Sequence, residues 1–444
     1  MTLLMETTLP FSYEYTKVLQ LVSVIAHSLL YFYLFWLTGS ALYSFYLEFI
    51  KRDDASTYFA KRLIELPFKK LSFPLVLGLI PFLVIYSLDL SWLKGEEFNP
   101  VHNWSLVTFV VFAISIFSLY YYKFSFGLIT LLHKSVIEKE SPEYLGLMEN
   151  NLKNHKRSAF LGLAGILITL FLISLLNVAK LDYNQTNYRF DFIGYLLQFE
   201  VYFRFLFYLI ISFSLTFFVN LFLNLVWEDT RLDDEEGISK YIEEKLLKGA
   251  FATVLLQPIL ILIDILILPR NSLSYWVFIA SGISVILLFL ISNQLNAYRK
   301  EFSKSYLNYS FYMVIIVIIF ISIKDVIAFG NVLKPKSVEI SKNFLTYEEN
   351  LKSKLNIKTV TISGEEIFTA KCSACHRFDS KLVGPPYNVV LKKYENNRDK
   401  LVKFILNPVK VDPAYPSMPS QGLIPPEAEA VADYIMKVYK EGKQ

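Results

Sequence analysis

Long runs of apolar residues alternate with short polar segments along the first 323 residues of the chain. A helix needs about 20 apolar residues to cross a bilayer, where lipid offers the backbone no hydrogen-bond partner. Eight runs fall in this range, although Pro74 and Pro81 interrupt the second. They are residues 18–46, 71–92, 104–122, 158–179, 202–227, 249–268, 273–295 and 306–323. The pattern predicts an all-α, polytopic bundle of eight transmembrane helices in a lipid bilayer.

The pattern changes after residue 323. Residues 324–357 are polar, and we expect a tether there. Its apolar residues recur at the spacing of a short amphipathic helix: Phe344, Tyr347, Leu351 and Leu355. We expect a membrane domain over 1–323, this tether, and a small soluble domain over 358–444.

Composition supports the membrane assignment. Hydrophobic residues make up 54% of the chain and the mean hydropathy is +0.40, which is too apolar for an ordinary soluble protein. The net charge of +4 is small and gives no reason to expect a nucleic-acid partner.

Lys and Arg gather in alternate loops, and such loops face the cytoplasm. The loops after the first, third, fifth and seventh runs hold 18 positive residues, against 5 on the opposite side before the soluble domain. The 18 are Lys51, Arg52, Lys61, Arg62, Lys69, Lys70, Lys134, Lys139, Lys153, Lys156, Arg157, Arg231, Lys240, Lys245, Lys248, Arg299, Lys300 and Lys304; the 5 are Lys17, Lys94, Lys180, Arg189 and Arg270. We therefore expect both termini on the outer, periplasmic side of the cytoplasmic membrane. Residues 2–16 do not read as a signal peptide, so uncleaved helices would carry the soluble domain across.

The chain has two cysteines, and both lie in the motif Cys372-Ser373-Ala374-Cys375-His376. C-x-x-C-H is the attachment signature of haem c: each thiol adds to a vinyl group, and the adjacent His becomes the first axial ligand of the iron. A zinc site would need further Cys or His ligands, and a thioredoxin-like pair would need a βαβ setting. The motif predicts one covalent haem c held by Cys372, Cys375 and His376.

The sequence around the motif resembles class I cytochromes c over residues 358–440. Gly364 and Phe368 match the first helix of that family, which packs on its last helix. Gly384-Pro385-Pro386 matches a turn whose proline carbonyl accepts the N–H of the axial His, so the resemblance implies this role for Pro385.

The resemblance also implies a second axial ligand. Tyr415-Pro416-Ser417-Met418-Pro419 is similar to the ligand loop of the family, which makes Met418 the candidate. Met436 is the other methionine of this domain. Met/His ligation raises the reduction potential and favours electron transfer.

Ionisable residues at membrane depth are candidate functional groups. His27, Arg204 and Asp264 all fall in the outer half of the predicted bundle. They could line a quinol pocket in which His27 or Asp264 accepts a proton. Alternatively, Arg204 and Asp264 are interfacial or paired with each other, and His27 bonds within the bundle. The first helix, with His27 and Gly39, resembles that of the catalytic subunit of cytochrome bd quinol oxidase.

Three functions are open from the sequence. The first is electron transfer by a subunit of a respiratory complex, with redox partner proteins and other membrane subunits. The second is a quinol-oxidising enzyme, similar to cytochrome bd, whose bundle delivers electrons to the haem c. The third is a haem-based redox sensor or transporter.

Overall fold

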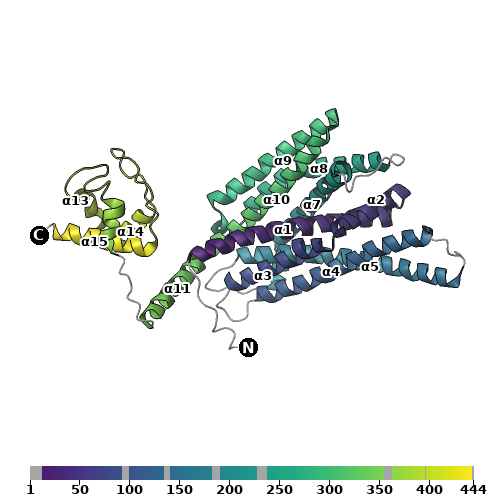
Figure 1. The fold of residues 1–444 in the computed structure, drawn as a ribbon, viewed down its shortest axis with the longest axis horizontal. Coiled ribbons are helices and arrows are strands. Elements are labelled where there is room, and N and C mark those ends of the chain that lie inside the picture. Colours follow the sequence, from purple (N-terminus) through teal and green to yellow (C-terminus); the bar gives the residue numbers. More distant parts are fainter. Residues whose placement is uncertain are drawn as a thin grey trace. The chain divides into compact units, whose positions relative to one another are not determined.

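The computed structural model describes residues 13–92, 100–134, 141–182, 191–227, 238–354, 363–395 and 397–442. Leu355, the expected domain start at 358, and the loop residues Lys94, Lys139, Arg189 and Arg231 lie outside these ranges. Every regular element within them is helical. The chain divides into two compact units, Met1–Leu345 and Thr346–Gln444 (Figure 1).

Eight helical spans of the first unit are long and apolar enough to cross a membrane, which confirms the predicted bundle. They are Lys17–Lys51, Pro74–Trp92, Pro100–Leu132, Pro142–Leu181, Phe199–Val226, Ser239–Ile267, Tyr275–Glu301 and Lys304–Val332. The elements that form them are α1 (Tyr13–Phe45), η2 (Tyr46–Lys51), η4 (Pro74–Leu79), α3 (Ile80–Trp92), α4 (Pro100–Lys134), α5 (Pro142–Leu181), α7 (Phe199–Leu221), η5 (Phe222–Val226), α8 (Ile238–Ile267), α9 (Tyr275–Glu301) and α10 (Lys304–Val332). Between them lie α2 (Asp54–Glu65), η3 (Leu66–Phe68), α6 (Phe192–Leu196) and η7 (Arg270–Ser272).

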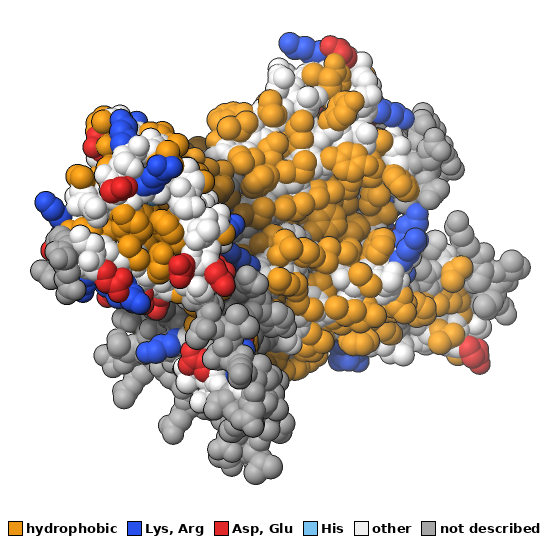
Figure 2. All heavy atoms as spheres, turned by 60° about the vertical axis from the view of Figure 1, so that its left-hand side comes forward, with side chains coloured by type: hydrophobic (Ala, Val, Ile, Leu, Met, Phe, Trp, Pro, Cys, Tyr) orange, Lys and Arg blue, Asp and Glu red, His pale blue; other side chains and the backbone are white. Residues whose placement is uncertain are grey.

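The outer surface of the bundle is apolar. In Figure 2 the visible face of this unit is covered mainly by hydrophobic side chains, with Lys and Arg gathered toward its margins. Phe117 and Leu266, for example, are 72% and 82% exposed. Such side chains are stable on the surface of a bundle only where lipid surrounds it.

Helix α7 is the most deeply buried span and lies between α1 and α8. Gly39 brings α1 against it: a Cβ at this position would overlap the Ser212 carbonyl oxygen and the Thr216 hydroxyl. Without a hydrophobic force between helices in lipid, close backbone approach at small residues is what packs them.

The last span ends nine residues later than predicted. Its apolar run stops at Ile323, but α10 continues to Val332 and the helix α11 (Lys334–Lys354) follows. Lys324 and Asp325 therefore lie inside the bundle rather than in a polar tether. The helix can continue because both charges are buried against partners of opposite charge, as described below.

The second unit is a small helical domain. Its elements are α12 (Gly364–Ile367), η8 (Phe368–Cys372), α13 (Tyr387–Val390), η9 (Leu391–Tyr394), α14 (Arg398–Leu406) and α15 (Pro425–Glu441). Val431, Ile435 and Tyr439 of α15 are almost fully buried and pack with Leu391 and Leu401 in one core. The helix α15 is thus the base on which the shorter elements rest.

Candidate functional site

The two cysteines and the histidine of the C-x-x-C-H motif are brought together by a tight turn after η8. The N–H groups of Cys375 and His376 both donate to the Cys372 carbonyl, at 3.1 and 3.0 Å. Both cysteines are free thiols, and both thiols and the imidazole line the same cavity.

A second turn fixes the imidazole. His376 Nδ1 lies 3.2 Å from the Pro385 carbonyl oxygen, which can only accept, so Nδ1 carries the hydrogen and Nε2 keeps its lone pair for a metal. The Gly384 N–H donates to the Cys375 carbonyl at 2.8 Å and draws this turn onto the motif. A Cβ at position 384 would overlap the imidazole ring, so the turn can approach this closely only with glycine.

The motif is positioned by the contact between the first and last helices of the domain. The Ser363 hydroxyl accepts the Glu366 N–H at 3.2 Å and caps the start of α12. A Cβ on Gly364 would overlap the Ala430 carbonyl oxygen of α15. The Phe368 ring lies 5.6 Å from that of Tyr434, also on α15. These contacts place Gly364 and Phe368 as the resemblance implied.

The cavity at the motif has a volume of about 360 Å³, within the range of cofactor sites. Its walls are largely apolar and include Leu391, Leu401 and Ile435, which suit the faces of a porphyrin. Met418 also lines it, whereas Met436 lies in the core along α15. Two thiols, one imidazole lone pair and one thioether around an apolar cavity form a donor set that fits haem c.

The protonation of the site before attachment follows from its burial. Burial raises the pKa of the Cys372 thiol, and the nearby Cys375 sulfur raises it further. Burial also lowers the pKa of the His376 imidazole, against the opposing effect of the bond to Pro385. At pH 7 the Cys372 thiol is therefore protonated and the imidazole is neutral, the form that binds a metal.

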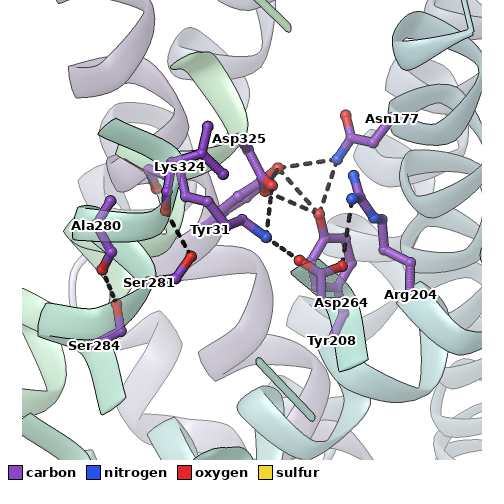
Figure 3. Close-up of polar contacts among 12 residues, drawn as sticks. Tyr31, Asn177, Arg204, Tyr208, Asp264, Ala280, Ser281, Ser284, Lys324 and Asp325 are labelled. Atoms are coloured by element: carbon purple, nitrogen blue, oxygen red, sulfur yellow. Dashed lines mark hydrogen bonds and ion pairs between the residues drawn. The ribbon is translucent and has the colours of Figure 1, made fainter. Parts of the chain in front are cut away.

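In the membrane unit, Arg204 and Asp264 are paired with each other. Arg204 Nη2 lies 3.4 Å from Asp264 Oδ1, and both side chains are almost fully buried. Lys324 bonds to the other oxygen of Asp264 and lies 3.1 Å from Asp325 Oδ1. Figure 3 shows Lys324 reaching between the two carboxylates, with Arg204 on the far side of Asp264.

The network extends through hydroxyl and amide groups. Tyr31 and Tyr208 each donate to Asp325 Oδ2, at 3.2 and 3.3 Å. Asn177 donates to both tyrosine oxygens, at 2.9 and 3.0 Å. With Asp264 from α8, the helices α1, α5, α7, α8 and α10 all contribute (Figure 3).

His27 lies beside this network. Its Nδ1 is 2.8 Å from the carbonyl oxygen of Ser23, one turn earlier on α1. It lines a small cavity of about 30 Å³ together with Arg204, Asp325 and the ion pair of Lys180 with Asp89. The structure thus brings His27 and Arg204 to one cavity. Asp264 is paired with Arg204 but is not among the residues that line this cavity.

The sequence analysis did not identify Lys324, Asp325, Tyr31, Tyr208 or Asn177. Lys324 and Asp325 stand at the end of an apolar run, where charges usually mark the membrane boundary. Their signal was the apolar sequence Val326-Ile327-Ala328-Phe329, which follows them and continues the helical face. The tyrosines and Asn177 carry no such signal, because polar residues of this kind are also common in helix packing.

Residues 362–438 match the protein family described as Cytochrome c. The cytochrome c-551 of Pseudomonas denitrificans is similar to this chain, with 39% identity over 79 residues, which is 95% of that protein and 17% of this chain. The family match lies in the C-terminal domain. The resemblance of the first helix to cytochrome bd is outside the family match and stays a prediction.

Proposed function

Because the chain belongs to the cytochrome c family through its C-terminal domain, we propose that it is a membrane-integral monohaem cytochrome that transfers electrons at the outer face of the cytoplasmic membrane. The observation that carries this proposal is the set of groups around one cavity: Cys372, Cys375, the oriented His376 and Met418. Haem c with such ligands cycles between ferrous and ferric iron without binding a substrate.

The residues of the chain serve this role by fixing the orientation of the His376 imidazole. The Pro385 carbonyl keeps the hydrogen on His376 Nδ1, so Nε2 is the nitrogen that would hold the iron. Tyr387 stacks on the imidazole with ring centres 4.8 Å apart and limits its rotation. A rigid site of this kind needs little reorganisation when an electron arrives or leaves.

The location and partners are inferred from the charge distribution and the spans. The 18-to-5 excess of Lys and Arg and the eight spans support a domain on the outer side, where haem is attached to c-type cytochromes. One span would suffice as an anchor. Eight therefore support association with other membrane subunits, as in a respiratory complex.

Attachment of haem is tested with Cys372→Ala combined with Cys375→Ala. Haem should remain on the wild-type chain in denaturing electrophoresis and be absent from the double variant, because no thioether can form. Ser373→Ala, between the two cysteines, is the matched control and should keep its haem. Haem staining of the double variant at the wild-type level would contradict covalent attachment through these cysteines.

A second function, oxidation of quinol by the bundle, is favoured by a specific observation. A cavity of about 380 Å³ lies at the end of the bundle next to the polar network, lined by Ser23, Asp89, Trp92 and Trp276 among others. It shares Ser23 and Asp89 with the small cavity of His27. Aromatic walls beside titratable groups suit the ring of a quinol, which loses two protons and two electrons on oxidation.

His27 is the proton acceptor in this reading. Its Nδ1 hydrogen points to the Ser23 carbonyl, so Nε2 is free to accept a proton from a quinol hydroxyl. In His27→Gln, reduction of the haem by a quinol analogue should slow about a hundredfold, at the low end of what a general base contributes. Ser28→Ala, whose hydroxyl bonds only within α1, is the control. If the purified wild-type protein is not reduced by quinol at all, the bundle is a docking platform and not an enzyme.

A further inference from the structure

A second titratable cluster lies at the opposite end of α1 from His27. His155 Nε2 is 2.6 Å from Glu48 Oε1, and Tyr122 donates to the other oxygen of Glu48. Ser125 Oγ is 2.5 Å from His155 Nδ1. His155 is 2% exposed and the Glu48 side chain 14%, so the pair is shielded but not sealed from the nearby aqueous phase. Glu48 stands three residues before Lys51, where the first span ends.

One face of α1 leads from this cluster into the membrane. Ser44, one turn before Glu48, donates to the Ala60 carbonyl at 2.8 Å and lies 3.1 Å from the Tyr122 hydroxyl. Ser40 and Trp36 follow at the same four-residue spacing, and Tyr33 is one turn further along this face. From Glu48 to Tyr33 the helix rises roughly 22 Å, at about 1.5 Å per residue. The stripe therefore crosses much of the bilayer.

Three consecutive members of this stripe have buried polar atoms without a hydrogen-bond partner. They are Tyr33 Oη, Trp36 Nε1 and Ser40 Oγ. Tyr33 and Ser40 are 0% exposed and Trp36 is 3% exposed. A buried polar group left without a partner costs about 1–3 kcal/mol, and a bound water beside each of these atoms would remove that cost.

Two buried serines elsewhere in the bundle, Ser174 and Ser284, donate to the carbonyl four residues before them, at 2.8 and 3.0 Å. Ser310 on α10 also has an unpaired hydroxyl, but it stands alone and not in a series along one helix face. The corresponding carbonyl for Ser40 is that of Trp36, and it already accepts the Thr216 hydroxyl at 3.1 Å. The hydroxyl of Ser40 is thus left for another acceptor.

The stripe ends close to the cavities that His27 lines. The Tyr33 ring lies against Gly78, where an added Cβ would be 2.9 Å from its Cδ1 and 3.4 Å from the Phe112 ring. Phe112 packs on Phe82 with ring centres 6.2 Å apart, and Phe82 lines a cavity shared by His27, Asp89 and Lys180. Contacts through Phe112 and Phe82 thus connect Tyr33 to that cavity.

We propose that a file of buried water molecules along this face of α1 carries protons between the Glu48–His155 cluster and the His27 network. A proton enters at Glu48 or His155 and passes by hydrogen-bond exchange through Ser44, whose hydroxyl turns away from the Ala60 carbonyl to do so. It then passes through Ser40, the waters and Tyr33, and reaches His27 or a carboxylate beside it. The Trp36 N–H can only donate, so it anchors a water without relaying protons. The proton moves alone, so the step needs no electron donor, and it does not depend on haem or quinol chemistry.

The presence of the waters is tested first, by hydroxyl-radical footprinting of the purified full-length protein with X-ray radiolysis. Radicals formed from bound water label adjacent side chains. Tyr33 and Trp36 should gain oxygen at rates close to those of exposed Tyr275 and Trp276, although both are buried. Phe218, which is buried and 1% exposed, is the internal control. Labelling of Tyr33 and Trp36 as slow as that of Phe218 would overturn the proposal.

Proton conduction is tested in vesicles that contain the protein and a pH-sensitive dye, with an imposed potassium diffusion potential. The wild-type protein should conduct protons faster than empty vesicles. Ser40→Val removes one relay hydroxyl and should slow conduction about tenfold, a barrier increase of about 1.4 kcal/mol. Ser284→Val is the matched control and should leave it unchanged. Equal rates in wild-type and Ser40→Val vesicles, or wild-type vesicles no faster than empty ones, would refute transfer along this path even if the waters are present.

Discussion

At the scale of single residues, the site depends on atoms that lie close together in sequence. Cys372, Cys375 and His376 share one turn, and Pro385 reaches the imidazole from nine residues further on. Such a set can be identified from sequence because attachment of haem c requires the two cysteines and the histidine at this spacing. Met418 needed the family resemblance, because a methionine between prolines has no intrinsic pattern that marks it as a ligand.

The sixth ligand is tested with Met418→His. Imidazole stabilises ferric iron more than a thioether does, so haem should remain bound while its reduction potential falls. A fall on the order of 0.1 V or more is reasonable, since axial ligands shift haem potentials over about 0.8 V. Potentiometric titration of the purified protein measures it. Met436→Leu is the control, because Met436 packs in the core. An unchanged reduction potential in Met418→His, with the sulfur-to-iron absorbance band intact, would mean that Met436 is the sixth ligand.

At the scale of elements, close approach between helices at glycine determines how the helices pack in both units. In the membrane unit, Gly39 lets α1 touch α7. In the soluble unit, Gly364 lets α12 touch α15 and so sets where the motif begins. The sequence indicates each helix through its apolar period, but it does not say which pairs of helices meet.

The role of Gly364 is tested with Gly364→Ala. The new Cβ would overlap the Ala430 carbonyl oxygen, which is backbone and cannot rotate away. We expect a loss of about 1–3 kcal/mol in the unfolding free energy of the domain, as for other overpacked contacts. Denaturant titration followed by haem absorbance measures the loss.

Gly442→Ala is the matched control, since a Cβ there would lie 3.4 Å from the Val438 carbonyl oxygen, near ordinary contact. Equal unfolding midpoints for the two variants would mean that α12 is free to shift away from α15.

The buried network shows why part of the structure could not be predicted. Its charged residues, together with the neighbouring Lys180–Asp89 pair, come from α3, α5, α7, α8 and α10, and partners such as Arg204 and Asp264 are 60 residues apart. A single sequence shows each charge alone, and an isolated Lys324 after an apolar run reads as a membrane boundary. Only the packed bundle shows that Lys324 has a partner of opposite charge, Asp264, on another helix.

At the scale of the whole molecule, the membrane topology can be tested directly. The Lys and Arg asymmetry and eight spans predict a C-terminus on the outer side. A reporter that is active only in the cytoplasm, fused after Gln444, should therefore be silent. The same reporter inserted after Phe302, between α9 and α10 and expected on the inner side, is the positive control. Activity of the C-terminal fusion together with the control would mean that the last span does not cross, and activity of the C-terminal fusion alone would mean that the bundle is inverted.

The buried network also determines how the molecule responds to voltage. In their ordinary charge states, Asp89, Asp264 and Asp325 balance Lys180, Arg204 and Lys324, so with neutral His27 the network carries no net charge. A transmembrane potential acts on net charge, at about 2.3 kcal/mol per elementary charge for 100 mV across the full membrane. The resting network is therefore almost indifferent to the potential. A single added proton gives the network one positive charge within the field. The fraction of molecules that hold this proton then depends on the voltage, in proportion to the depth of the binding group in the membrane.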